Sequence, residues 1–182
     1  MVKEFRADLE RYRALGVKSR DILLNPAVWA IFWYRFGHWI YKEGSPRFLR
    51  PPLKLLHVLG SLYFEALQQM RLDASAEIGQ GLHIAHSGGI VLHHNTVIGR
   101  NCNLAHQVTI GTAGMGRQGV PRIGDYVYIG TGAVVIGDIT IGDSARIGAN
   151  SLVNRDVPAG ATVIGVPALI VKIDDPTVKT KA

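Results

Sequence analysis

Histidines are the residues of this sequence whose type and spacing could do chemistry. Five of the seven fall in one segment: His83, His86, His93, His94 and His106. Such a cluster suits two chemistries. Several imidazoles together can ligate a zinc ion, or a single imidazole, with a pKa near neutrality, can act as general base on a hydroxyl. Which of the two chemistries applies depends on the elements that position these side chains.

A repeat of six residues surrounds the histidines. Counting in sixes from Leu72 gives inward positions that are mostly aliphatic: Ile78, Ile84, Ile90, Thr96, Cys102 and Val108, then Ile123, Ile129, Val135, Ile141, Ile147 and Val153. Neither an amphipathic helix nor alternating strands have this period. We therefore predict one short strand and one tight turn per six residues, with three strands closing each coil. The pattern resembles the hexapeptide-repeat family, which implies a mainly β fold, a left-handed parallel β-helix over residues 71–171.

The first 70 residues have a different period and are predicted to be an α-helical region. Helical spacing of apolar residues runs over 2–15, 25–41 and 53–70. Gly16, the segment 44–46 and the pair Pro51-Pro52 separate these three runs. Residues 172–182 carry almost no apolar signal and are predicted to be a C-terminal tail.

Charge is concentrated in the helical region. Residues 1–70 hold eleven Lys or Arg against six Asp or Glu, while residues 71–182 hold nine against eight. A basic, aromatic helical region suggests peripheral association with an anionic membrane surface, and the nearly neutral repeat argues against a nucleic-acid partner. The single cysteine, Cys102, cannot form an intrachain disulfide. We therefore expect a cytoplasmic protein, either free or located at the inner face of the membrane.

The repeat is interrupted once, between Val108 and Ile123. That interval is one six-residue step plus nine further residues, and its glycine-rich content, Thr112 to Val120, predicts a loop extruded from the coil. Loops on rigid scaffolds are where functional residues concentrate. We expect this loop to border the functional site.

The residues around His86 resemble the serine acetyltransferase family. The resemblance rests on residues 81–91, on Val108-Thr109-Ile110-Gly111 before the glycine-rich loop, and on the segments 121–124 and 165–168. It implies an acetyl-CoA-dependent O-acetyltransferase that needs no metal. In that family the histidine matching His86 is the general base, which takes the proton of an acceptor hydroxyl as the hydroxyl attacks the thioester.

The same resemblance implies where acetyl-CoA binds and how the chain assembles. In the family, acetyl-CoA lies in a groove between subunits of a homotrimer, which can associate further. The matching positions here are Thr112, Ala113, Thr131, Arg146 and Ala149. Small residues there would let the pantetheine arm approach the backbone, and Arg146 would meet a phosphate.

The acceptor is where the sequence departs from the family. Charged family residues that hold serine are replaced by Ala85, Gly119 and Val120, and the aspartate that orients the catalytic histidine is replaced by Arg71, with Asp73 nearby. The pattern is closer to the branch that acetylates sugar hydroxyls in polysaccharide biosynthesis, so a saccharide is the favoured acceptor. A divergent serine acetyltransferase is the alternative, and a metal hydratase of the γ-carbonic-anhydrase type is less favoured.

Overall fold

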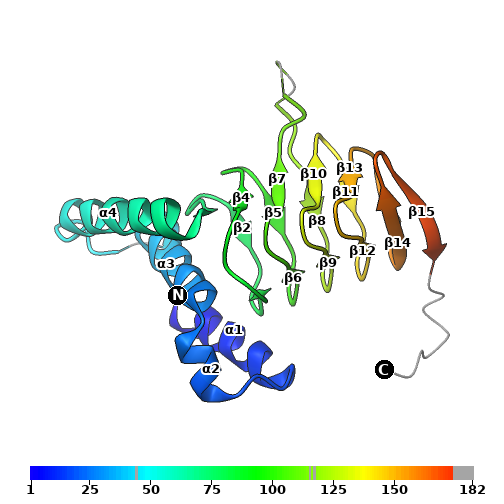
Figure 1. Ribbon diagram of the computed structural model, residues 1–182. Coiled ribbons are helices and arrows are strands. Elements are labelled where there is room, and N and C mark those ends of the chain that lie inside the picture. Colours follow the sequence, from blue (N-terminus) through cyan, green and yellow to red (C-terminus); the bar gives the residue numbers. More distant parts are fainter. Residues whose placement is uncertain (44, 115, 117, 174–182) are drawn as a thin grey trace.

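The computed structural model describes residues 1–43, 45–114, 116 and 118–173, in two parts (Figure 1). The N-terminal part is helical, and the rest is a triangular β-solenoid that the helices cover at one end. This is the predicted left-handed parallel β-helix with an N-terminal helical region. Of the predicted tail, residues 174–182 lie outside the described residues, while the last strand reaches Ile173.

Three parallel sheets form the sides of the solenoid. Sheet A contains β1 (Met70–Leu72), β4 (Ile90–Leu92), β7 (Thr109–Gly111), β10 (Val134–Ile136) and β13 (Leu152–Val153). Sheet B contains β2 (Glu77–Ile78), β5 (Val97–Ile98), β8 (Arg122–Ile123) and β11 (Thr140–Ile141). Sheet C contains β3 (His83–Ile84), β6 (Asn103–Leu104), β9 (Tyr128–Ile129), β12 (Arg146–Ile147), β14 (Ala161–Gly165) and the antiparallel β15 (Ala168–Ile173).

Aliphatic side chains stack inside the solenoid, one column per sheet. In sheet C, for example, Ile84, Leu104, Ile129 and Ile147 are in register and are all at most 1% exposed. Burial of such aliphatic side chains contributes about 1.5–3 kcal/mol each. The stacked columns are therefore the core that fixes the shape of every corner.

The register differs from the predicted one at two places. After Ile84 of sheet C, the next residue that joins a stacked column is Leu92 and not the predicted Ile90. The turn between β3 and β4 therefore has two residues more than the six-residue repeat requires. The step from Ile110 to Ile123 is correspondingly seven residues longer than six, where nine extra residues were predicted. The predicted register differs from the observed one because two inward positions, two residues apart, occur in each six-residue repeat. A shift of the register by two residues therefore still falls on buried residues.

Thr96 and Cys102 are the residues that reveal this slip. Both are 0% exposed and occupy the second kind of inward position, where small residues fit. Burial raises the pKa of the Cys102 thiol to about 11, and its Sγ donates to the carbonyl of Gly124 at 3.1 Å. Cys102 is therefore a core residue in the thiol form and is unsuited to act as a nucleophile.

The helical region has one more α-helix than predicted. Its elements are α1 (Val2–Ala14), α2 (Ser19–Leu24), α3 (Pro26–His38), the π-helical turn η1 (Trp39–Glu43) and α4 (Arg50–Gln68). The helix α2 was missed because six residues are too few to show a period. The helix α4 begins three residues before the predicted start at residue 53, because proline is tolerated in the first turn of a helix and Pro51 and Pro52 do not interrupt it.

The helices complete the open end of the solenoid with side chains in place of a strand. The Tyr34 hydroxyl of α3 donates to the carbonyl of Ala76 at 2.8 Å and accepts from the amide of Ile78 at 3.2 Å. Arg35 donates to the carbonyls of Ile78 at 2.6 Å and Gly79 at 2.7 Å. These contacts satisfy the backbone of the edge strand β2, which would otherwise be unpaired.

A buried ion pair joins α1 to the same end. The Asp8 carboxylate accepts from Arg35 Nε at 2.9 Å and Nη2 at 3.1 Å, and both side chains are 1% exposed. Asp8 also accepts from the amides of Gly81 and Leu82, at 2.8 and 2.9 Å. Both members of this pair therefore form hydrogen bonds to each other and to the backbone, which is the condition under which a buried ion pair is tolerated.

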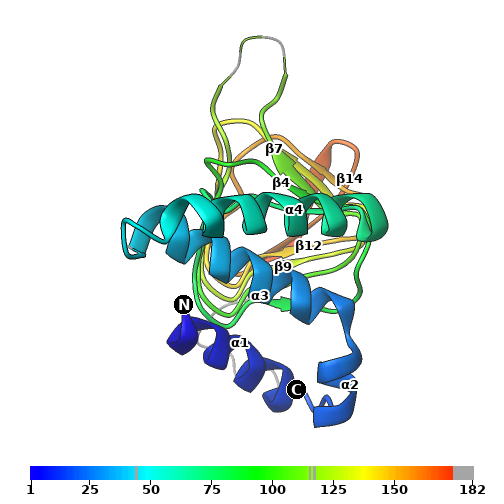
Figure 2. The same ribbon diagram turned by 90° about the vertical axis from the view of Figure 1, so that its left-hand side faces the viewer.

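Figure 2 looks directly at this end, where α3 and α4 lie across the solenoid. The outer face of α4 exposes several large apolar side chains, among them Leu55, Leu59 and Leu67. No helix within the described residues is long and apolar enough to cross a bilayer. Peripheral membrane association through the basic, aromatic helices stays a prediction.

Candidate active site

His86 lies on the corner where the chain passes from β3 to β4. This is the corner with the two extra residues, and its backbone turns with the help of Gly88 and Gly89, whose φ values are +115° and +67°. Glycine adopts such values without the strain a side chain would add. The insertion lifts His86 out of the stacked core, and its side chain is exposed.

A cavity of about 570 Å³ opens beside His86, between this corner and the helical region. Its polar lining includes His83, Ser87, Asp21 of α2 and Asn25, the residue that caps α3. The amide of Ala27 donates to Asn25 Oδ1 at 2.9 Å, so this lining residue is held in place. The cavity is the space in which an acceptor hydroxyl can reach the imidazole.

The strand that leads to His86 is held by α1. The Tyr12 hydroxyl, on a side chain 1% exposed, donates to the carbonyl of Ile84 at 2.7 Å and accepts from its amide at 3.0 Å. The Tyr12 ring also packs edge-on against His83, with centroids 4.5 Å apart. Burial, and secondly the positive charge of Arg11, lower the pKa of His83. A neutral His83 therefore forms one wall of the cavity at neutral pH.

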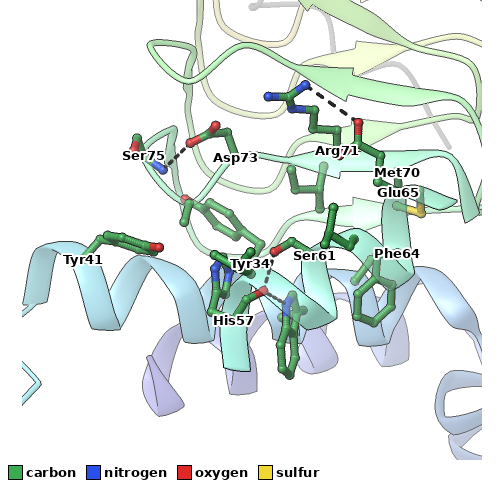
Figure 3. A pocket seen from close by; sticks show the side chains of 16 residues that line it. Tyr34, Tyr41, His57, Ser61, Phe64, Glu65, Met70, Arg71, Asp73 and Ser75 are labelled. Carbon is green, nitrogen blue, oxygen red and sulfur yellow. Dashed lines mark hydrogen bonds and ion pairs between the residues drawn. The ribbon is translucent and has the colours of Figure 1, made fainter. Parts of the chain in front are cut away.

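Within the described residues no carboxylate contacts His86. Asp73, considered from the sequence as its orienting partner, lies instead in a different cavity of about 390 Å³ between α3, α4 and β1. Figure 3 shows this second cavity: Asp73 accepts from the amide of Ser75 at 2.8 Å, and Arg71 pairs with Glu65 at 3.8 Å. The suggestion for Asp73 was wrong because β1 belongs to sheet A, whereas His86 follows a strand of sheet C.

Two predicted site residues, Thr131 and Ala149, lie at the same corner of the solenoid as His86. At this corner the amides of Gln107, Gly132 and Asn150 donate to the carbonyls of Gly88, His106 and Thr131, so that Gly88, His106, Thr131 and Ala149 stack in successive coils. His86 lies on the insertion, two residues before Gly88. Thr131 is half-buried and Ala149 is exposed, so beyond the two histidines the edge carries only small side chains. Arg146 lies on β12 three residues before Ala149, with an exposed guanidinium that forms no ion pair within the described residues.

The sequence predicts that acetyl-CoA binds at this edge. Small side chains leave room for an extended arm to lie against the corner, and the unpaired Arg146 suits a phosphate. The thioester would then reach the end of the edge that carries His86 and His106.

Thr112 and Ala113 are not brought to this edge. They follow β7 at the corner between sheets A and B, where the described part of the long loop rises from the solenoid (Figure 1). Thr112 lines a cavity with His93 and His94, whose rings lie 4.0 Å apart. A strand of sheet A separates this corner from His86, so one chain does not unite the two halves of the predicted site.

One chain offers no support for the alternative of a metal hydratase within the described residues. Across the described residues, no group of three or more His, Cys, Asp or Glu side chains gathers as metal ligands would. The five clustered histidines are divided between the two corners, with His83, His86 and His106 on the His86 side.

Sequence reasoning missed the contribution of the helical region to the site. Tyr12 and Asp21 reach the His86 corner from elements more than sixty residues away in sequence. No local pattern distinguishes them from other helical residues. Only the packing of α1 and α2 against the first coil reveals them.

The fold is that of the hexapeptide-repeat acyltransferases. The family model described as bacterial transferase hexapeptide (six repeats) matches residues 121–155. Over 175 residues the chain is 33% identical to a serine acetyltransferase of Mycobacterium tuberculosis, covering 96% of this chain and 73% of the relative. The chain belongs to the serine acetyltransferase family and is an acetyl-CoA-dependent O-acetyltransferase.

Solved structures agree with this assignment. The serine acetyltransferase of Neisseria gonorrhoeae has a TM-score of 0.82 and 34% identity, covering 97% of this chain and 68% of that one. A Brucella abortus serine acetyltransferase in complex with coenzyme A has a TM-score of 0.82 and 30% identity, covering 96% and 68%. These relatives favour the serine alternative over the saccharide acceptor and give no support to a role in polysaccharide biosynthesis.

Proposed function

We propose that this chain acetylates the hydroxyl of L-serine, with acetyl-CoA as donor and His86 as general base. The observation that carries the proposal is the position of His86, between the acceptor cavity and the edge of small residues that suits acetyl-CoA. Both substrates can therefore meet at one imidazole without a covalent acyl-enzyme.

The reaction is a direct transfer. His86 takes the proton of the acceptor hydroxyl while the hydroxyl oxygen bonds to the thioester carbon, and the carbonyl becomes an oxyanion. Collapse of the oxyanion breaks the carbon–sulfur bond. The proton on His86 then passes to the departing thiolate, so that an O-acetyl ester and the free thiol of coenzyme A are released and His86 returns to its starting state.

Charged groups of the helical region support serine as the acceptor. Asp21 lines the cavity beside His86 and can accept from an ammonium group. The charge of Arg11 is close enough to lower the pKa of His83, and Arg11 Nε is buried without a partner within the described residues. An unpaired buried donor costs about 1–3 kcal/mol. These two groups can supply an acidic and a basic charge in place of those missing at Ala85, Gly119 and Val120.

A sugar hydroxyl is the second candidate acceptor. It is favoured by the uncharged residues Ala85, Gly119 and Val120, because a neutral acceptor needs no charge at those positions. A serine bound without charge partners would carry a cost of several kcal/mol per desolvated charge.

The acceptor is tested by thiol release from acetyl-CoA. We expect saturable turnover with L-serine and none with a panel of sugar nucleotides and oligosaccharides. Asp21→Asn should raise the KM for serine by about tenfold or more, with kcat less affected. Turnover with a sugar and none with serine would replace serine by the second candidate, and no turnover with either would refute the proposed function.

We further propose that the protein is a homotrimer with its sites between subunits. The support is the separation of the two halves of the site onto different corners of one chain. A second subunit can place its Thr112 and Ala113 beside the His86 edge of the first. Such closed, symmetric arrangements are the common form of protein oligomers.

A further inference from the structure

His106 is the side chain that contacts the ring of His86. Their ring centroids lie 6.1 Å apart with an interplanar angle of 74°, an edge-to-face arrangement. His106 lies at the same corner in the next coil, where the amide of Gln107 donates to the carbonyl of Gly88 at 2.8 Å. Neighbouring strands are separated by about 4.8 Å. His106 therefore lies at the active-site corner, next to His86.

The two nitrogens of the His106 ring have different surroundings. Within the described residues, Nδ1 is buried and has no hydrogen-bond partner. Nε2 has no partner either, but it is not among the buried atoms. A neutral imidazole carries one donor and one acceptor nitrogen. With the hydrogen on Nε2, no donor is buried unpaired, and the ring presents an N–H to the edge.

We propose that His106 is a second catalytic residue, which donates a hydrogen bond from Nε2 to the carbonyl oxygen of the acetyl group. The inference rests on the proposed direct transfer. When the acceptor oxygen attacks on the His86 side, the thioester carbon becomes tetrahedral and its oxygen gains negative charge. A donor already aimed at that oxygen stabilises the charge as it develops.

The two imidazole rings have different roles in this reaction. His86 moves the proton, whereas His106 neither gains nor loses one and acts only on the oxyanion. Thr131, the next residue along the edge, lies one coil further from His86 and borders the arm of the donor substrate. His106 thus occupies the position between the base and the pantetheine.

The test compares His106→Ala, His106→Gln and a matched control. Gln107→Asn changes the next residue of the same turn, where φ is +58°, a value that asparagine tolerates. We expect His106→Ala to lower kcat by about 10²–10³-fold, with the KM for acetyl-CoA changed by less than about threefold. His106→Gln, which retains an N–H donor, should recover at least about tenfold of the loss. The control should match the wild type.

Three measurements separate this role from a structural one. The thermal unfolding midpoint and the calorimetric affinity for coenzyme A should be unchanged in all variants. Long-range proton–nitrogen spectra of the wild-type ring should show hydrogen on Nε2 and a shift of that resonance when acetyl-CoA is added. A kcat for His106→Ala within about threefold of the wild type overturns the proposal, and so does a ring with hydrogen on Nδ1.

The spectra also keep this inference distinct from the proposed function. If the wild type turns over no acceptor, the proposed function fails, but the ring still reports on acetyl-CoA. A shifted Nε2–H resonance would then support the placement of His106, and an unchanged one would refute it.

Discussion

At the level of single residues, the proposed general base has no carboxylate partner within the described part of the chain. His86 contacts another histidine, His106, and faces a cavity whose acidic group, Asp21, belongs to a helix. The backbone of Ile84 is fixed by Tyr12, so the strand before His86 is positioned by the helical region. The orientation of the base therefore depends on packing around the corner.

Ala149 tests the edge predicted to hold acetyl-CoA. In Ala149→Phe, a large ring would occupy the edge two coils beyond His106, and the KM for acetyl-CoA should rise by about tenfold or more. Because Ala149 is exposed, the unfolding midpoint should not change. Ala159→Phe is the matched control, since Ala159 is an exposed alanine between sheets B and C. Equal KM values in the two variants would refute the assignment of this edge.

At the level of elements, α1 and α3 act as the missing first strand of the solenoid. The buried pair of Asp8 and Arg35 supplies both acceptors and donors to the edge backbone. Asp8→Ala removes one member of a fully buried pair and should lower the free energy of unfolding by about 3–5 kcal/mol. Chemical denaturation measures this value.

Glu10→Ala, on the same helix, is the control for Asp8→Ala. Glu10 pairs with Arg6 at the surface, where both side chains are more than half exposed. Such pairs contribute little, so its unfolding midpoint should equal that of the wild type. An Asp8→Ala protein as stable as the control would contradict the strand-replacing role of this pair.

His57 makes the packing of α3 against α4 sensitive to acid. Its ring stacks on Trp33, with centroids 5.8 Å apart, and burial lowers its pKa below the ordinary value. As the pH falls below about 6.5, the unfolded state takes up a proton that the folded state resists. Stability should therefore be lost as the pH falls from this value through the folded pKa.

The variant His57→Phe removes this titration and keeps an aromatic ring. Denaturation at about pH 7.5 and about pH 5.5 should show a smaller loss of stability in the variant than in the wild type. His83 and His93 also have lowered pKa values, so some loss remains in both. An equal loss in the two proteins would show that His57 does not carry the effect.

The elements differ in how far the sequence could predict them. The solenoid was predictable because every coil repeats the same inward aliphatic positions. The two-residue slip at the His86 corner was not, since Ile90 and Leu92 are both buried and the period alone cannot choose between them. Asp21 and Tyr12 could not be assigned to the site, because they reach it through contacts between two regions with different periods.

At the level of the whole molecule, a single chain separates the His86 edge from the loop corner that carries Thr112 and Ala113. A shared site predicts complementation. His86→Ala and Ala113→Phe should each be inactive alone. Mixed trimers that contain both variants can be isolated with two different tags. They should regain activity where the intact His86 of one chain meets the intact Ala113 of the other. Light scattering should give the mass of a trimer. Mixed trimers as inactive as the single variants would refute the shared site.

The central claim is that His86 is the base that transfers acetyl from acetyl-CoA to a hydroxyl. The most direct measurement is steady-state thiol release with L-serine by the wild type and by His86→Ala, with coenzyme A affinity and oligomeric mass measured on both. We expect His86→Ala to lose about 10²–10⁴-fold in kcat while binding coenzyme A and assembling as the wild type does. Turnover by His86→Ala within about threefold of the wild type would contradict the account.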